Sequence, residues 1–164
     1  MSVQTSVIDP AIAIAGMVAF GSTTVDDSVS GFAHENLEPG LLVCWQDSVQ
    51  RTFKLATGAA GEVIVGIVKH STVTQQGTPN TNATFPEGSQ LSVVRSGIVW
   101  CVMNGTAIAK GAPLRVVTAA PNRGRLSVVV AGSNPAPLVA YRPSVAGLVM
   151  AEINLTTGNA AVVA

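Results

Sequence analysis

Few side chains in this sequence could take part in catalysis or metal binding. The two histidines, His34 and His70, lie in different segments, and neither has a second ligand at the spacing of a zinc site. His34 is followed by Glu35, but the second histidine that a metalloprotease helix needs is missing. We therefore expect both histidines to be solvated loop residues rather than metal ligands.

The carboxylates and glycine-rich segments are equally poor matches to catalytic motifs. The Asp26-Asp27 pair is followed by Ser-Val-Ser, which offers no cage of oxygen ligands for a cation, so a turn is the better interpretation. The segment at residues 105–111 misses the spacing of a phosphate-binding loop. Ser22 and Ser96 each adjoin a glycine, but no Gly-x-Ser-x-Gly nucleophile elbow occurs. The residues thus predict no enzyme, no metal or cofactor and no small-molecule substrate.

The composition argues against several classes of partner. A length of 164 residues favours one domain, and the nine bases cancel the nine acids. Because charged residues make up only 11% of the chain, we expect no binding to nucleic acid and none to an anionic membrane. Hydrophobic residues reach 48%, and a soluble monomer usually carries more surface charge than this chain offers. We therefore expect partners to cover much of the surface.

The charges are distributed unevenly along the chain. The first fifty residues hold six acids and no base, whereas the remaining 114 hold nine bases and three acids. This asymmetry suggests that the N-terminal part lies against something basic. The basic element could be the protein's own C-terminal half, a sister subunit or a separate partner.

Two cysteines and one apolar stretch bear on the cellular compartment. Cys44 and Cys101 each adjoin a tryptophan in an apolar run, which is typical of buried thiols in a reducing compartment, so no disulfide is expected. The apolar stretch at residues 11–20 is too short to span a bilayer. It is also a poor signal peptide, because no Lys or Arg precedes Arg51. We expect the protein to stay where it is made.

Short strands separated by turns account for most of the chain. Val, Thr and Ile are frequent, Gly or Pro recurs at short intervals, and no long window shows a helical period. Asp47-Ser48 and Pro121-Asn122-Arg123-Gly124 are expected turns. The expected strands span residues 41–45, 49–55, 63–69, 90–95, 98–103, 113–118, 125–131, 138–142 and 145–155. This pattern predicts an all-β fold, a single-domain β-barrel or β-sandwich of jelly-roll or β-tulip-like type.

The segment at residues 49–55 gives the clearest alternation. Val49, Arg51, Phe53 and Leu55 fall on one face of this expected strand. Arg51 is the one charge on that apolar face, so we expect the strand to lie near an edge or an interface.

Two segments differ from the rest of the domain. Residues 1–20 are expected to form an extended N-terminal arm, and residues 21–164 a single β domain with an exposed loop or flap at about 71–88, which is rich in Thr, Asn and Gln. Within the arm, small and large side chains alternate, and such a run can add as a strand to an exposed sheet edge. The run consists of Ala11, Ile12, Ala13, Ile14 and Ala15. These five residues are candidate contacts with another subunit, or else simply the first core strand.

Seven short segments in a fixed order carry a resemblance to a known family. They are Gly16-Met17-Val18-Ala19, Leu37-Glu38-Pro39-Gly40-Leu41-Leu42-Val43, Val65-Gly66-Ile67-Val68, Pro86-Glu87-Gly88, Gly97-Ile98-Val99-Trp100-Cys101-Val102, Lys110-Gly111-Ala112-Pro113-Leu114-Arg115-Val116 and Val145-Ala146-Gly147-Leu148-Val149. Together with the neutral charge and an aromatic content of 4%, this order resembles the capsid decoration, or structural cement, proteins of tailed bacteriophages.

The resemblance implies a virion protein that stabilises a shell without catalysis. It implies a small homo-oligomer, with a homotrimer as the first expectation and a dimer as the second. This oligomer would bind the major capsid protein on the outer surface of an icosahedral head, at capsomer junctions, after synthesis and assembly in the cytoplasm of the host bacterium. The alternating run of the arm would then contact the capsid or a sister subunit.

Two functions from other classes stay open at this point. A virion-associated receptor- or carbohydrate-binding β module could use the loop at residues 71–85, although sugar binding normally needs exposed aromatic side chains. A trimeric β-barrel enzyme is disfavoured, because no carboxylate cluster lies beside a glycine-rich loop.

Overall fold

Ten strands and no helix make up the regular structure of the described residues. The computed structural model describes residues 14–18, 27–59, 61–70, 84–105, 107–130, 136, 138–145, 147–155 and 161–162. The strands are β1 (Asp27–Ala33), β2 (Leu42–Asp47), β3 (Thr52–Leu55), β4 (Val63–Val68), β5 (Gln90–Val102), β6 (Leu114–Val116), β7 (Leu126–Val128), β8 (Leu138–Ala140), β9 (Leu148–Asn154) and β10 (Ala161–Val162). Across these ranges there is no helix long and apolar enough to cross a membrane. The expected all-β single domain is confirmed.

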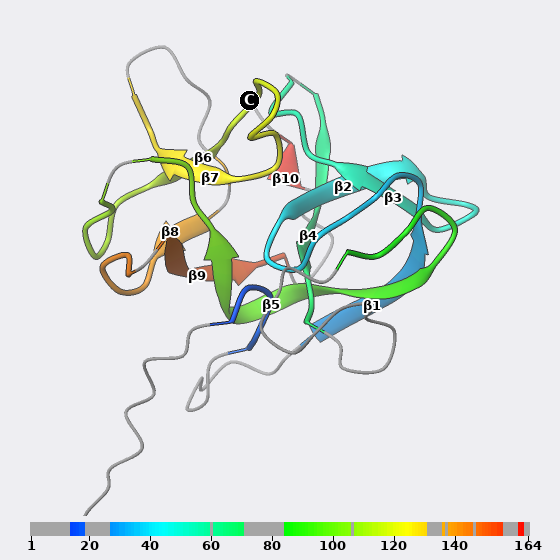
Figure 1. Cartoon of the computed structure of the whole chain (residues 1–164), viewed down its shortest axis with the longest axis horizontal. Coiled ribbons are helices and arrows are strands. Elements are labelled where there is room, and N and C mark those ends of the chain that lie inside the picture. Colours follow the sequence, from blue (N-terminus) through cyan, green and yellow to red (C-terminus); the bar gives the residue numbers. More distant parts are fainter. Residues whose placement is uncertain are drawn as a thin grey trace, which may run out of the picture.

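Five strands close into a barrel (Figure 1). The order around the barrel is β1-β3-β2-β4-β5 and back to β1, and every pair is antiparallel except β1 with β3. Gly66 sits in β4 at a φ of +155°, where an added Cβ would run into the carbonyl oxygen of Val94 in β5. A glycine at this position therefore lets β4 and β5 approach closely enough to complete the ring.

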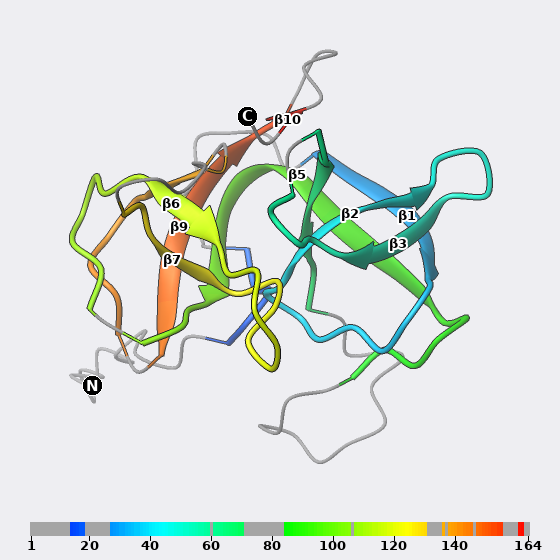
Figure 2. The same ribbon diagram turned by 90° about the horizontal axis from the view of Figure 1, so that it is seen from above.

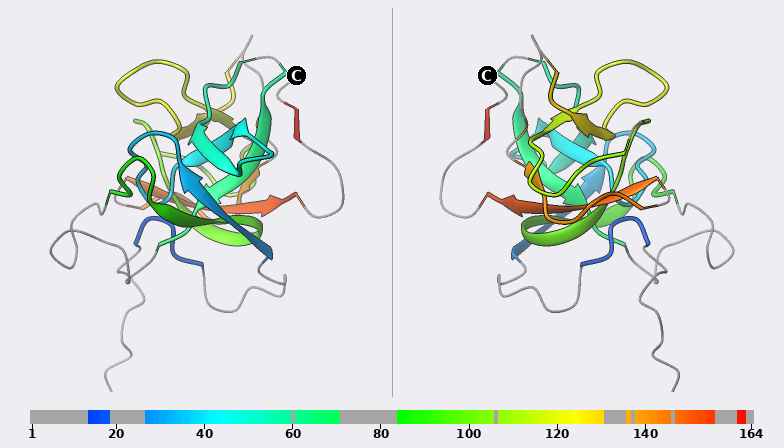
Figure 3. Two further views of the ribbon diagram at one scale, coloured as in Figure 1. Left: turned by 90° about the vertical axis from the view of Figure 1, so that its right-hand side faces the viewer. Right: turned by 90° about the vertical axis from the view of Figure 1, so that its left-hand side faces the viewer.

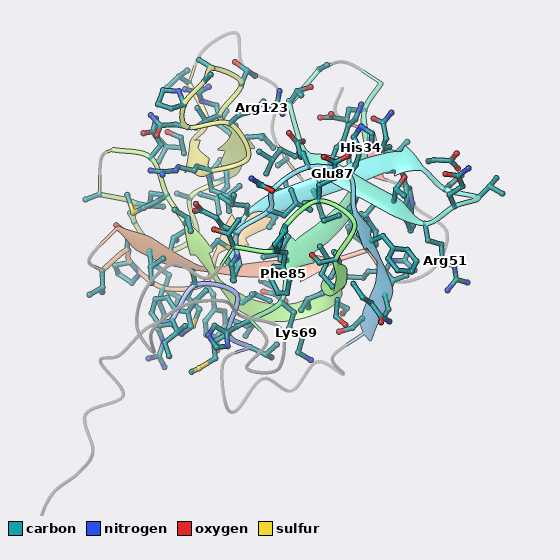
Figure 4. All side chains as sticks on the ribbon, turned by 45° about the vertical axis from the view of Figure 1, so that its right-hand side comes forward. His34, Arg51, Lys69, Phe85, Glu87 and Arg123 are labelled. Atoms are coloured by element: carbon teal, nitrogen blue, oxygen red, sulfur yellow. The ribbon has the colours of Figure 1, made fainter. Side chains whose placement is uncertain are left out.

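Apolar side chains fill the interior of the barrel. The buried cluster consists of Ala33, Leu37, Val43, Phe53, Val65, Val68, Phe85, Leu91 and Val93. Phe85 comes from the segment just before β5 and points inward among the barrel strands (Figure 4). Phe53 stacks on Trp45 with ring centroids 4.7 Å apart, which ties β3 to β2. The barrel interior is thus a packed core.

The two halves of the long strand β5 pair with different groups of strands. Its first half pairs with β1 and β4 in the barrel, whereas residues 96–102 pair with β9, which in turn pairs with β8. The hairpin of β6 and β7 is joined to β8 by the Pro113–Val139 bridge and to the end of β5 by the Met103–Leu126 bridge. Residues 96–102 of β5 and strands β6 to β9 therefore form a second ring beside the barrel, here called the second lobe (Figures 1 and 2).

A second buried cluster, separate from the barrel interior, is shared by the two parts. It fills the second lobe and extends onto the outer face of β2 and β4 of the barrel. Its buried members are Leu42, Ala56, Ile64, Ile67, Val94, Val99, Cys101, Met103, Ile108, Leu114, Val116, Leu126, Ala136, Leu138, Ala140, Val149, Ala151, Ile153 and Leu155. Figure 3 shows the barrel end and the second-lobe end of the molecule in turn. Because the lobes share both a strand and a core, they form one domain.

Most expected strands are present, but β1 and the two-residue β10 were not expected, and two of the expected strands are in fact one. β1 was not expected, because its sequence DSVSGFA carries little apolar alternation. The two strands expected at residues 90–95 and 98–103 are a single strand, because Gly97, at a φ of +138°, continues β5 instead of ending it. The expected hairpin turn at Pro121-Asn122-Arg123-Gly124 is confirmed, since β6 and β7 pair as antiparallel strands on either side of it.

The expected strand at residues 49–55 is too long at its start. Val49 lies in the turn between β2 and β3 and is 90% exposed, so its assignment to the apolar face was wrong. The carboxylate of Asp47 accepts hydrogen bonds from the backbone N–H groups of Val49 (2.8 Å) and Gln50 (3.0 Å), which holds the turn. Arg51 completes the turn at a φ of +53°, and its side chain projects away from the barrel (Figure 4).

Candidate functional site

The residues considered for catalysis do not come together in the described structure. His34 is exposed at one end of the barrel and His70 is half-buried just after β4. Ser96 is buried within β5. Within the described ranges, no three His, Cys, Asp or Glu side chains are grouped in a way that could hold a metal ion. Ser22 and Asp26 lie outside the described residues.

The two cysteines are free and buried. Burial and the adjacent carboxylate of Glu62 raise the pKa of the Cys44 thiol to about 12. Burial within the core of the second lobe also raises the pKa of the Cys101 thiol. Both groups are therefore neutral thiols near pH 7, a state in which cysteine is a poor nucleophile.

Glu62 is the centre of a polar cluster that sequence reasoning missed. Its carboxylate accepts hydrogen bonds from the Cys44 thiol (3.1 Å), from the backbone N–H of Thr57 (2.7 Å) and of Gly58 (2.8 Å), and from the Thr57 hydroxyl (3.1 Å). A carboxylate surrounded by donors in this way fastens the loop between β3 and β4 to the barrel wall. The role of the cluster is to hold this loop in place. No sequence motif predicts the cluster, because its members are spread over residues 44–62.

An ion pair joins the barrel to the second lobe. The Arg123 guanidinium, in the turn between β6 and β7, donates to the Glu35 carboxylate at 2.9 Å. Glu35 also accepts a hydrogen bond of 2.8 Å from the backbone N–H of Leu55 in β3. One of the six acids of the first fifty residues is thus paired with the C-terminal half of the same chain.

The end of the expected arm lies along the barrel. Ala11, Ile12 and Ala13 are outside the described residues, whereas Ile14 and Ala15 are half-buried. Just after them, the backbone N–H of Gly16 donates to the carbonyl of Trp100 (2.7 Å), and the N–H of Trp100 donates to the carbonyl of Met17 (3.0 Å).

A further bridge pairs Val18 with Val99, so residues 16–18 extend the edge of β5 within the same chain. The carbonyl of Gly16 also accepts a hydrogen bond of 2.9 Å from the backbone N–H of His70. Residues 14–18 therefore belong to the body of the domain.

Large apolar side chains that remain exposed are candidate contacts with partners. In the part of the chain that the structure describes, they are Phe32, Val49, Val130, Val139, Tyr141 and Val145. Phe32 and Val49 belong to the barrel, whereas the other four belong to the second lobe. Among the described residues, most of the large apolar side chains that are exposed thus lie on the second lobe.

A family comparison identifies the kind of protein. Residues 3–162 match the model of a family described as Structural cement protein (E217 gp24/Pam3 gp6). The match spans nearly the whole sequence. The chain belongs to this family. It is therefore a structural component of a phage virion. The resemblance seen in the order of the seven short segments is confirmed.

One solved structure supports the fold. A chain from the capsid of Myoviridae phage XM1 is similar over 94% of this chain and 98% of that one, with a TM-score of 0.67 and 16% sequence identity. The N base of head fibre gp8.5 of bacteriophage phi29 is similar over 83% of this chain and 98% of its own, with a TM-score of 0.45 and 15% identity. No curated protein sequence matches the chain significantly.

Proposed function

We propose that this cement protein binds the major capsid protein on the outer surface of an icosahedral phage head, at junctions between capsomers, and stabilises the shell against rupture. The observation that carries the proposal is the family match over residues 3–162. The two-ring body supports it, because a rigid body that shares one core can hold two neighbouring subunits at a fixed separation.

The working unit in this proposal is a homotrimer, with a dimer as the second possibility. The composition supports an oligomer, because 48% hydrophobic and 11% charged residues leave more apolar surface than a soluble monomer usually exposes. A trimer that bridges several shell subunits engages them together. Each contact can then be weak while the attachment as a whole is strong.

The protein acts mechanically in this proposal and turns over no substrate. Contacts made across a capsomer junction must break before the capsomers separate, so they raise the barrier to rupture. Because closed shells repeat the junction many times, even roughly 1–2 kcal/mol per copy would slow rupture noticeably.

We also propose that the arm contributes to attachment. Ala11, Ile12 and Ala13 would extend beyond the part of the segment that is fastened to β5, and would pair with the sheet edge of a neighbouring subunit or of the shell. The alternation of small and large side chains at these positions supports strand addition.

Binding to heads purified without the protein tests this function. Full-length protein is mixed with such heads, and the bound fraction is measured by co-sedimentation while the oligomeric state of the free protein is measured by analytical ultracentrifugation. Saturable binding and a trimer are expected. A failure to bind would contradict the proposal and favour a virion-associated receptor- or carbohydrate-binding module, and a monomer at micromolar concentration would contradict the trimer.

A further inference from the structure

Two adjacent loops form the far end of the second lobe, here called the tip (residues 107–112 and 141–145). The backbone N–H of Gly111 donates to the carbonyl of Ala140 (2.7 Å), and the N–H of Ser144 donates to the carbonyl of Ile108 (2.9 Å). The Ser144 hydroxyl accepts a hydrogen bond of 2.8 Å from the N–H of Ile108. The tip, at the left of Figure 1, is therefore a surface on which both loops are held in place.

The exposed side chains of the tip are those that protein interfaces favour. Tyr141 is 41% exposed and Val145 is 55% exposed, and Arg142 and Lys110 are exposed beside them. Tyrosine and arginine are enriched among the residues that contribute most to binding free energy. An apolar centre with charges around it is the usual anatomy of an interface.

The tip carries charge of one sign only. The sequence from Gly88 to Ala151 contains no Asp or Glu but six Lys or Arg residues, among them Lys110 and Arg142. The next acid, Glu152 of β9, pairs in register with Val139, which is about two residue pairs away from the tip. Glu152 therefore lies outside the tip. A surface of this kind is complementary to a partner that bears carboxylates.

A second copy of this chain is a poor source of those carboxylates. Three of the six acids that follow residue 27 already accept hydrogen bonds within their own chain: Glu35 from Arg123, Asp47 from its turn, and Glu62 from the loop after β3. A contact between two tips would bring like charges together, which costs free energy. The charge pattern therefore favours a different protein as the partner.

From this charge pattern and from the proposed function, on which the inference rests, we infer that the tip is the face that docks on the shell. Tyr141 and Val145 would be buried against an apolar patch of the shell protein, and Lys110 and Arg142 would face carboxylates at its rim. The docking surface thus lies on the second lobe, at the end away from the barrel.

Two sets of variants in the full-length protein test the inference. The tip set consists of two double variants, Lys110→Glu with Arg142→Glu and Tyr141→Ala with Val145→Ser. The matched control is the double variant Arg51→Glu with Val49→Ser. These two residues are also exposed, but they lie in the barrel turn between β2 and β3, away from the tip. Circular dichroism and sedimentation check folding and oligomeric state, and co-sedimentation with undecorated heads measures attachment at several salt concentrations.

We expect each tip variant to weaken attachment at least about tenfold, which corresponds to about 1.4 kcal/mol, with folding and oligomeric state unchanged. The reason is that each variant removes either the apolar centre or the positive charges of the docking face. The control variant should attach within about twofold of the wild type, and Arg142→Lys, which keeps the charge, should restore most of the loss. Wild-type attachment should also weaken as salt rises.

Three results would overturn the inference, and each is distinct. Tip variants that attach as well as the wild type contradict the docking face while leaving the proposed function intact. Tip variants that lose the oligomer instead make the tip a contact between copies. A wild-type protein that does not attach contradicts the proposed function itself.

Discussion

The glycines at positive φ serve two different purposes. Gly16 (φ +76°) and Gly88 (φ +79°) have nearly the same backbone conformation, which favours glycine because a Cβ is strained there. They differ in the space around them. A Cβ on Gly16 would lie 2.6 Å from the carbonyl oxygen of Val68 and 2.7 Å from the nitrogen of His70, whereas a Cβ on Gly88 would meet nothing within 4 Å. Gly16 is thus needed for packing as well as for its turn.

This pair of glycines gives a matched test of how the N-terminal segment packs. Gly16→Ala should lower the free energy of unfolding by about 3 kcal/mol, because the strain of the left-handed conformation adds to a clash with backbone atoms. Gly88→Ala should lower it by only about 1 kcal/mol. Denaturant unfolding of both variants measures the difference, and equal losses would contradict the packing of residues 14–18 against β4 and β5.

The cysteines should be protected from alkylation in the native protein. With a pKa of about 12, the Cys44 thiol is roughly a thousandfold less ionised at pH 8 than a thiol with the ordinary pKa of 9.0, so its reaction with iodoacetamide should slow accordingly. Cys101 is fully buried in the described core and should react no faster. Mass spectrometry after timed labelling measures this, with urea-unfolded protein as the control. Rapid labelling of either native thiol would contradict the buried positions.

At the scale of the elements, the sequence predicted the strands that Val, Leu and Ile mark, and missed β1 and the two-residue β10. The strands from β2 to β4 and from β6 to β9 were expected because Val, Leu and Ile mark them. β1 was not predicted because its buried positions Gly31 and Ala33 carry small residues, whereas the large apolar Phe32 lies on the exposed face. A glycine within a long apolar run, as in β5, can break or continue a strand, and only the pairing partners decide which.

The ion pair between the lobes should contribute modestly to stability. The side chains of Arg123 and Glu35 are 38% and 33% exposed, so their coupling in a double-mutant cycle should be about 0.5 kcal/mol, and weaker at high salt. Glu35→Ala should cost about 1 kcal/mol more than Arg123→Ala, because it also removes the acceptor of the Leu55 N–H. Equal losses from the two single variants would contradict the second role of Glu35.

Removal of the arm should weaken attachment to heads without changing the fold. Deletion of residues 1–13 keeps the segment that is fastened to β5, so the truncated protein should fold and sediment like the full chain. Its attachment to heads should be weaker, because the strand-forming run is lost. Ile12→Ser in the full-length chain is the matched variant and should show part of the loss. Unchanged decoration by the truncated protein would contradict a role for the arm in attachment.

For the whole molecule, the resemblance to the cement family predicted the class of protein but not its shape. That resemblance rested on the order of seven short segments together with neutral charge and few aromatic residues, whereas the short strands separated by turns predicted the all-β domain. The sharing of β5 between two rings could not be predicted, because it depends on pairings between residues far apart in the sequence, such as Val102 with Leu148. The tip was missed for the same reason, since residues 107–112 and 141–145 meet only in the folded chain.

The most direct test of the claim that the protein is a mechanical cement is the rupture of DNA-filled heads with and without the protein. Heads that lack it are saturated with the purified full chain, heated in steps, and assayed for DNA release with an intercalating dye, with untreated heads of the same preparation as the control. We expect a higher rupture temperature and slower genome loss for the decorated heads, because the bridging contacts must break before capsomers separate. Equal rupture temperatures at full occupancy would contradict the claim that the protein is a mechanical cement.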